Sequence, residues 1–188
     1  MDDITNLFLL DEQKQSPNIR EILLYTIFIF LLSNVVYIIC LKIFNINPKL
    51  DEKNIFEQWR NKGISVSNVL FSGILNTSIY NVLAEELTIR MLLMKLILIK
   101  TLKIDTLTAV LIQAVIFGSL HLSNNLSERQ SCNYTKLQVI NSSITALISG
   151  FVFVYSNSLI PSILSHFLTN FCATINETIE YRNYLLSN

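Results

Sequence analysis

An unbroken apolar run near the start of the chain most constrains how the chain can fold. Residues 22–41 contain no charged side chain and consist mainly of isoleucine, leucine, phenylalanine, tyrosine and valine. An α-helix needs about 20 such residues to cross the hydrocarbon core of a bilayer. The run is also longer than the roughly 7–15 apolar residues of a cleavable signal peptide. It therefore predicts a transmembrane helix that is retained as an anchor.

Further apolar segments follow along the rest of the chain. They cover residues 66–84, 91–99, 106–122, 137–155 and 159–175. The fourth of these also carries small residues, which suit close packing between helices. Only 15% of the residues are charged and the mean hydropathy is +0.46, whereas an ordinary soluble domain has about 25% charged residues. The sequence thus predicts an all-α, polytopic integral membrane protein with about six transmembrane helices of roughly 20 residues each.

A polar stretch separates the first apolar segment from the others. Residues 42–62 carry four lysines and Arg60 together with Trp59, the only tryptophan of the chain. Tryptophan and basic side chains gather at the membrane–water interface, so this stretch favours an amphipathic connector. We therefore expect residues 1–62 to form an N-terminal anchor span and connector, and residues 63–188 to form the core.

The balance of charges bears on the partners of the protein. The chain has 14 basic and 14 acidic residues, which gives a formal net charge of zero. Proteins that bind nucleic acid need a basic face to neutralise phosphates, so we expect no nucleic-acid partner. The expected surroundings are a lipid bilayer, that of the endoplasmic reticulum if the source is a eukaryote and the cell membrane if it is a bacterium.

Two adjacent carboxylates, Glu85 and Glu86, follow directly on the second apolar segment, and Arg90 comes four residues after Glu86. Residues four apart share a helix face, so we expect Glu86 and Arg90 to form an ion pair that makes both tolerable in a low dielectric. Glu85 points elsewhere and lacks that partner, which suits the role of a general base. Taken alone, these residues are equally compatible with a hydrated helix end at the interface.

The chain has only two histidines, and each lies in an apolar segment with a partner at helical spacing. Phe117 precedes His121 by four residues, and Asn170 follows His166 by four residues. Each histidine alone is compatible with a core residue that donates a hydrogen bond to a backbone carbonyl, and Asn170 with an interhelical hydrogen-bond group. Together with the carboxylates, they supply a base, an imidazole that orients water and neutral donors for an oxyanion. Hydrolysis of a peptide bond requires these groups.

Taken in order, the three motifs resemble the signature of a known family. They read Glu85-Glu86-x-x-x-Arg90, Phe117-x-x-x-His121 and His166-x-x-x-Asn170. This pattern on successive apolar segments is similar to that of the CPBP intramembrane proteases, which include the type II CaaX prenyl endopeptidases and bacterial bacteriocin-immunity proteins. The resemblance covers residues 68–175, and every motif position matches.

The resemblance implies a catalytic role for the motif residues. Glu85 and His121 would together activate a water molecule. His166 and Asn170 would stabilise the oxyanion of the tetrahedral intermediate, while Glu86, in its ion pair, would be structural or auxiliary. The implied function is an intramembrane endopeptidase that cleaves near the C-terminus of lipidated, CaaX-prenylated proteins. Its partners would be such a lipidated or membrane-bound peptide or protein, and the bilayer.

Two other functions stay open at this point. Within the same family, the protein could cleave other membrane peptides or act as a bacteriocin-immunity factor. In a different class, it could be a transporter in which the same ionisable residues relay protons or bind a cation. Transporters of that kind more readily show an internal repeat and broken helices, and neither is visible in the sequence. A scaffold with a vestigial site is disfavoured because every motif residue is present.

The sequence also leaves the cofactor open. Two histidines and a glutamate form a plausible zinc set. However, the chain lacks an H-E-x-x-H motif, in which the two histidines share one helix. We favour a mechanism without a cofactor, with zinc as the alternative.

Overall fold

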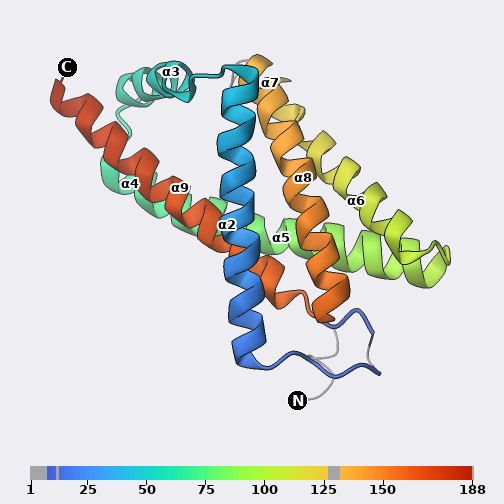
Figure 1. Ribbon diagram of the computed structural model, residues 1–188. Helices are drawn as coiled ribbons and strands as arrows, with labels where there is room; N and C mark the ends of the chain where they lie inside the picture. The colour runs from blue at the N-terminus through green and yellow to red at the C-terminus, as the bar shows by residue number, and fades with distance from the viewer. Residues whose placement is uncertain (1–7, 12, 127–131, 188) are drawn as a thin grey trace.

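The structure is a computed structural model that describes residues 8–11, 13–126 and 132–187. Every regular element within these ranges is a helix (Figure 1). In chain order the elements are α2 (Ile19–Phe44), α3 (Pro48–Asn61), α4 (Val66–Ser72), η1 (Gly73–Asn81), α5 (Val82–Glu86), η2 (Leu87–Thr101), α6 (Thr106–Leu120), α7 (Ser123–Leu126), α8 (Cys132–Ser156) and α9 (Ile160–Ser187). The predicted all-α fold is confirmed for the described residues.

Helix α2 begins with a capping box and leaves one side apolar and exposed. The Asn18 side chain accepts a hydrogen bond from the Glu21 backbone N–H at 3.0 Å, and the Glu21 carboxylate accepts one from the Asn18 backbone N–H at 2.9 Å. One side of α2 packs against α8 and α9. The exposed apolar side chains are Leu23, Leu24, Ile27, Phe28, Leu31, Val35, Ile38 and Ile39. A continuous apolar surface of this kind suits contact with lipid.

Among the residues that the structure describes, two helices are long and apolar enough to cross a membrane, judged by length and composition. They are α2, with a mean hydropathy of 2.5, and Tyr134–Ser156 within α8, with a mean hydropathy of 1.7. Helix α6 is also apolar but shorter. The helices therefore agree with a membrane protein, and the expected six spans stay a prediction.

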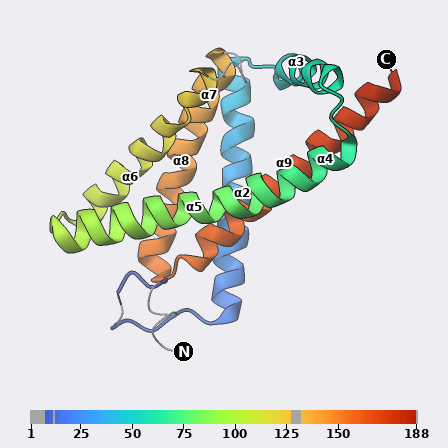
Figure 2. The same cartoon turned by 180° about the vertical axis from the view of Figure 1, so that it is seen from behind.

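Two segments that the sequence analysis separates lie on one continuous helix. Elements α4, η1, α5 and η2 follow one another without a gap from Val66 to Thr101, and Figure 2 shows them as one long rod. The expectation of separate helices at residues 66–84 and 91–99 is therefore wrong. The stretch contains no proline, and the buried charges of Glu86 and Arg90 pair with each other instead of ending the helix in water.

The η1 and η2 parts of this rod have wide turns in which hydrogen bonds join residues five apart. The backbone N–H of Leu102 donates to Ile97 O at 2.9 Å, and Ser78 Oγ donates to Gly73 O at 3.1 Å. Wide turns of this type are rare and are frequent at functional sites. Here they flank α5, the short element that carries both carboxylates of the first motif.

The N-terminal region packs on the rest of the molecule. The backbone N–H of Leu159 donates to Phe8 O at 2.9 Å, and that of Asp11 donates to Asn157 Oδ1 at 2.7 Å. These bonds tie residues 8–11 to the turn between α8 and α9. The expected division of the chain after residue 62 stays a prediction.

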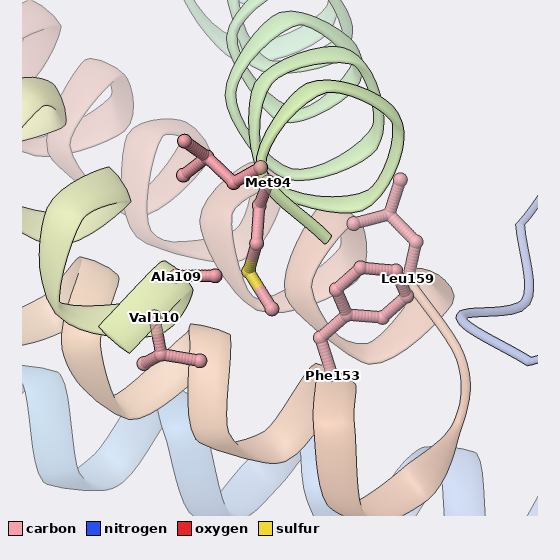
Figure 3. Packing of buried hydrophobic residues seen from close by; sticks show 6 residues of the cluster. Met94, Ala109, Val110, Phe153 and Leu159 are labelled. Atoms are coloured by element: carbon pink, nitrogen blue, oxygen red, sulfur yellow. The ribbon is translucent and has the colours of Figure 1, made fainter. Parts of the chain in front are cut away.

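The largest buried apolar cluster joins η2, α6, α8 and the start of α9. Figure 3 shows the Met94 side chain lying between Ala109 and Val110 on one side and Phe153 and Leu159 on the other. All five side chains are fully buried. This cluster fixes η2 relative to α6 and α9, and these three elements carry Arg90 and the two histidine motifs.

Helix α8 packs closely on α6 through small residues, as the sequence predicted. A Cβ atom on Gly150 would lie 2.6 Å from Gln113 Nε2 and 3.1 Å from Val110 Cγ1, and one on Gly118 would collide with Ser143. Side chains in so close a contact have no room to move.

Gly150→Leu is therefore expected to lower the thermal stability of the purified protein. Overpacking of a tight contact costs about 1–3 kcal/mol. The measurement is the midpoint of thermal aggregation in detergent, with Phe151→Leu on the same helix as the control because Phe151 is exposed. An unchanged midpoint for Gly150→Leu would contradict the close packing of α6 and α8.

Helix α3 docks on the last part of α9 through aromatic side chains. The ring centroids of Phe56 and Tyr181 lie 5.5 Å apart, and those of Trp59 and Tyr181 lie 5.3 Å apart. The Tyr181 hydroxyl donates to Ile64 O at 2.8 Å. The connector is thereby held beside the end of the molecule at which α6 ends (Figures 1 and 2).

Candidate active site

A buried ion pair forms the fixed part of the site. Arg90 Nη1 lies 2.6 Å from Glu86 Oε1, and the two side chains are only 2% and 1% exposed. The predicted pairing is therefore confirmed. The guanidinium also lies over the ring of Phe117, with 5.6 Å between Arg90 Cζ and the ring centroid. Charges this deeply buried are tolerated only with such partners, because their desolvation is costly.

His166 on α9 connects to both carboxylates. Its Nδ1 lies 2.9 Å from Glu86 Oε1, and its Nε2 lies 3.8 Å from Glu85 Oε2. The ionised Glu86 carboxylate can only accept, so Nδ1 carries a proton. Glu85 is 37% exposed whereas its neighbour Glu86 is buried. Glu85 is therefore the carboxylate of the pair that water can reach.

His121 follows directly on the last residue of α6. Its Nδ1 lies 3.0 Å from Phe117 O, one turn back on the helix. A carbonyl oxygen can only accept, so Nδ1 carries the proton and the neutral ring keeps a lone pair on Nε2. The Phe117 ring meets the imidazoles of His121 and His166 edge-on, at centroid distances of 5.2 and 6.1 Å. One aromatic ring thus sets the position of both histidines.

Asn170 lies one turn after His166 on α9 and faces η1. Its Nδ2 donates to Thr77 O at 3.1 Å. An amide nitrogen has two N–H groups, so this contact orients the side chain and leaves a second donor. The wide turns of η1 supply the carbonyl that holds the amide in place.

Two cavities meet at these residues. The first cavity has a volume of about 580 Å³, is bordered mainly by α2, α8 and α9, and reaches Glu86 and Arg90. The second cavity has a volume of about 900 Å³, is bordered by α3, η1 and the end of α6, and reaches Glu85. Both are lined by Phe117, His121, His166 and Asn170. The structure thus gathers all six predicted site residues around the junction of the two cavities.

One expected partnership is indirect. Glu85 and His121 both line the second cavity. The ionic contact of Glu85 is with His166, however, and the ring nitrogen Nδ1 of His121 is directed to Phe117 O. Any joint action of Glu85 and His121 therefore requires a water molecule between them. The catalytic roles of the site residues stay predictions.

The sequence analysis missed a polar row on α8 that lines the first cavity. Its members are Tyr134, Gln138, Asn141, Ser142, Thr145 and Ser149. Spacings of three, four and seven residues place side chains on one helix face. That periodicity is visible in the sequence, but the segment also carries small residues. The small residues predict close helix packing, whereas Ser142 and Ser149 also line the cavity.

The donors of the site bear on the alternative of a zinc ion. In the part of the chain that the structure describes, no group of three or more His, Cys, Asp or Glu side chains is arranged to hold a metal ion. The absence of a cofactor stays a prediction, which a chelator tests.

Comparison with known protein families identifies the family to which the chain belongs. The profile of the family described as type II CAAX prenyl endopeptidase Rce1-like matches residues 66–172, more than half of the chain, and this range includes all three motifs. No curated protein and no solved structure gives a significant match. The motifs on α5, η2, α6 and α9 thus belong to a protease domain, and the chain is a member of the type II CAAX prenyl endopeptidase Rce1-like family.

Proposed function

We propose that the protein is an intramembrane endopeptidase that hydrolyses a peptide bond near the C-terminus of prenylated CaaX substrates. Membership of the protease family supports hydrolysis. The observation that carries the assignment of residues is the second cavity, where the accessible Glu85 carboxylate and the Nε2 lone pair of His121 line the same space. The partners in this proposal are a lipidated or membrane-bound peptide and the bilayer.

The reaction begins with a water molecule between Glu85 and His121. The carboxylate or the imidazole removes a proton from the water while its oxygen attacks the scissile carbonyl carbon. The resulting oxyanion accepts hydrogen bonds from the second N–H of Asn170 and from the protonated ring of His166. The tetrahedral intermediate then collapses, the C–N bond breaks, and the leaving amine takes the proton that the water had lost.

Glu86 and Arg90 hold His166 in this arrangement. The hydrogen bond from His166 Nδ1 to Glu86 directs Nε2 toward the junction of the cavities. The negative charge of Glu86 stabilises the imidazolium that donates to the oxyanion. Glu86 is therefore a positioning residue in this proposal, as is Arg90 behind it.

The first cavity supports a lipid-bearing peptide as the substrate. It lies among α2, α8 and α9, and α2 and α8 are the helices that are long and apolar enough to span a membrane. A substrate anchored by a prenyl group can approach such a space from within the bilayer, while water reaches the junction through the more polar second cavity.

The test is cleavage of a farnesylated CaaX peptide by membranes that contain the wild-type protein, with and without a chelator. We expect release of the C-terminal tripeptide, no loss of rate with the chelator, and much slower cleavage of the same peptide without the farnesyl group. Cleavage only in the absence of the chelator would contradict the metal-free mechanism. A folded wild type that cleaves neither peptide would contradict the proposed substrate and favour another membrane peptide or an immunity role.

Asn170→Ala is expected to lower turnover of the farnesylated peptide by about 10²–10³, the usual effect of removing one oxyanion donor. The KM should change little, because the hydrogen bond is strongest in the transition state. Asn76→Ala is the control, since the Asn76 amide donates to Ser72 on its own helix and lines neither cavity. Turnover equal to that of the wild type would remove Asn170 from the oxyanion role.

A further inference from the structure

The polar row on α8 contains buried atoms without a partner in the described part of the chain. Asn141 Oδ1 and Thr145 Oγ1 have no hydrogen bond there, and both residues line the first cavity. Across the cavity, Ser33 on α2 is only 5% exposed, lines the same space, and has an equally unpartnered Oγ. A buried polar atom without a hydrogen bond destabilises the folded protein. Three such atoms around one cavity indicate a ligand that hydrogen-bonds to them.

The location of these atoms indicates where a ligand lies relative to the site residues. Helix α8 is one of the two helices suited to span a membrane, and polar groups inside such helices face protein or cavities and mark functional sites. Gln138, within the row, lines both cavities and so lies at the junction with the histidines. Asn141 and Thr145 follow on the same face of α8 and line the first cavity but not the second. A molecule held by the row therefore extends from the reacting centre into the first cavity.

The spacing of the row matches an extended peptide. Residues four apart on an α-helix are separated by about 6 Å along its axis. Peptide groups on one edge of an extended chain repeat every two residues, or about 6.8 Å. The Asn141 oxygen can accept from a peptide N–H, and the Thr145 hydroxyl can donate to a peptide C=O or accept from an N–H. Asn141 and Thr145 can thus contact two successive peptide groups on one edge of an extended substrate.

We propose that Asn141 and Thr145 of α8, with Ser33 of α2 opposite them, bind the main chain of an extended peptide substrate in the first cavity. This inference rests on the proposed protease function and adds the part of the site that holds the substrate beside the scissile bond. Main-chain hydrogen bonds are available in every peptide sequence. The row therefore gives affinity for extended peptide without selecting side chains.

The test measures binding separately from cleavage. A fluorescent farnesylated CaaX peptide is titrated into lipid nanodiscs containing the Glu85→Gln protein, with empty nanodiscs to subtract partition into lipid. Glu85 lines only the second cavity, so the row on α8 stays intact in this background. Thr145→Val and Asn141→Leu are each expected to raise the Kd about three- to tenfold, the effect of one net hydrogen bond. Thr145→Ser, which keeps the hydroxyl, should bind as the parent does.

Thr135→Val is the matched control. Thr135 lies on the same helix, is buried and has an unpartnered Oγ1, but it lines neither cavity. The Kd of the Thr135→Val protein for the peptide should equal that of the parent. A second test methylates one peptide N–H of the probe at a time. Methylation at one position should raise the Kd of the parent protein, because it removes the donor to Asn141. The same methylated probe should bind Asn141→Leu as well as the unmethylated probe does.

Three results would overturn the inference: no binding by the parent protein, an unchanged Kd in both Asn141→Leu and Thr145→Val, or an equal loss in Thr135→Val. Cleavage of the same peptide by the wild type is measured in parallel. If the wild type cleaves but the α8 variants bind normally, the proposed function holds and the binding role of α8 fails. If the parent binds through the row but the wild type does not cleave, the proposed function fails instead.

Discussion

Replacing Glu85 by alanine is expected to abolish cleavage of a prenylated peptide while leaving the amount of folded protein near that of the wild type. Glu85 is 37% exposed, and its ionic contact with His166 is long, at 3.8 Å, so its removal should cost the fold little. A general base contributes about 10²–10⁴ to the rate. His121→Ala should have an effect of the same size, because His121 lines the same cavity as Glu85 and shares the activation of water in the proposed mechanism.

The measurement is the initial rate of tripeptide release per amount of protein that elutes as a single species from size-exclusion chromatography. Glu57→Ala serves as the control, since Glu57 is an exposed carboxylate on α3 that lines neither cavity. Glu85→Gln keeps the size of the side chain and should be as inactive as Glu85→Ala. Retained cleavage in either Glu85→Ala or His121→Ala would contradict the activation of water by this pair.

Arg90→Ala is expected to reduce both the amount of folded protein and its activity. The substitution leaves the carboxylate of Glu86 almost fully buried without its 2.6 Å partner. Loss of one member of a buried ion pair typically costs about 3–5 kcal/mol, a large fraction of the stability of a small protein. Arg20→Ala at the exposed start of α2 is the control for the loss of an arginine. A well-folded and fully active Arg90→Ala protein would contradict the structural role of the pair.

A double variant separates stability from activity. When Glu86→Leu is combined with Arg90→Leu, no charge is left without a partner, and replacement of both members of such a pair is often neutral for stability. The double variant should therefore be more abundant than Arg90→Leu alone. It should still be inactive, because His166 loses the hydrogen bond that orients its ring. Recovery of activity together with abundance would show that Glu86 does not position His166.

The sequence predicted the local pairing of Glu86 with Arg90 better than it predicted the path of the chain. The pairing of Glu86 with Arg90 follows from helical spacing and the high cost of a buried charge, and both act within one helix turn. The gathering of His121 and His166 around Phe117 depends on where α6 and α9 lie relative to each other. Spacing alone does not determine that arrangement, and here the resemblance to a protease family supplied the expectation.

Apolar periodicity in the sequence does not predict two features of the structure. The charges between residues 84 and 91 looked like the end of one helix, but in the structure their partners allow the helix to continue from Val66 to Thr101. The small residues of α8, its serines among them, were expected to pack against a neighbouring helix, and the polar face that includes Thr145 was not predicted. Whether such side chains face a neighbouring helix or a cavity depends on the tertiary arrangement, and here Ser143 packs on Gly118 while Thr145 lines the first cavity.

The most direct test of the central claim is the cleavage of a farnesylated CaaX peptide in ¹⁸O-labelled water by purified wild type and by His121→Ala, followed by mass spectrometry. The account predicts that the wild type releases the tripeptide and leaves one ¹⁸O atom in the new carboxylate of the prenylated product. It predicts no product from His121→Ala at the same protein concentration. Equal product from both proteins, or none from a well-folded wild type, would contradict it.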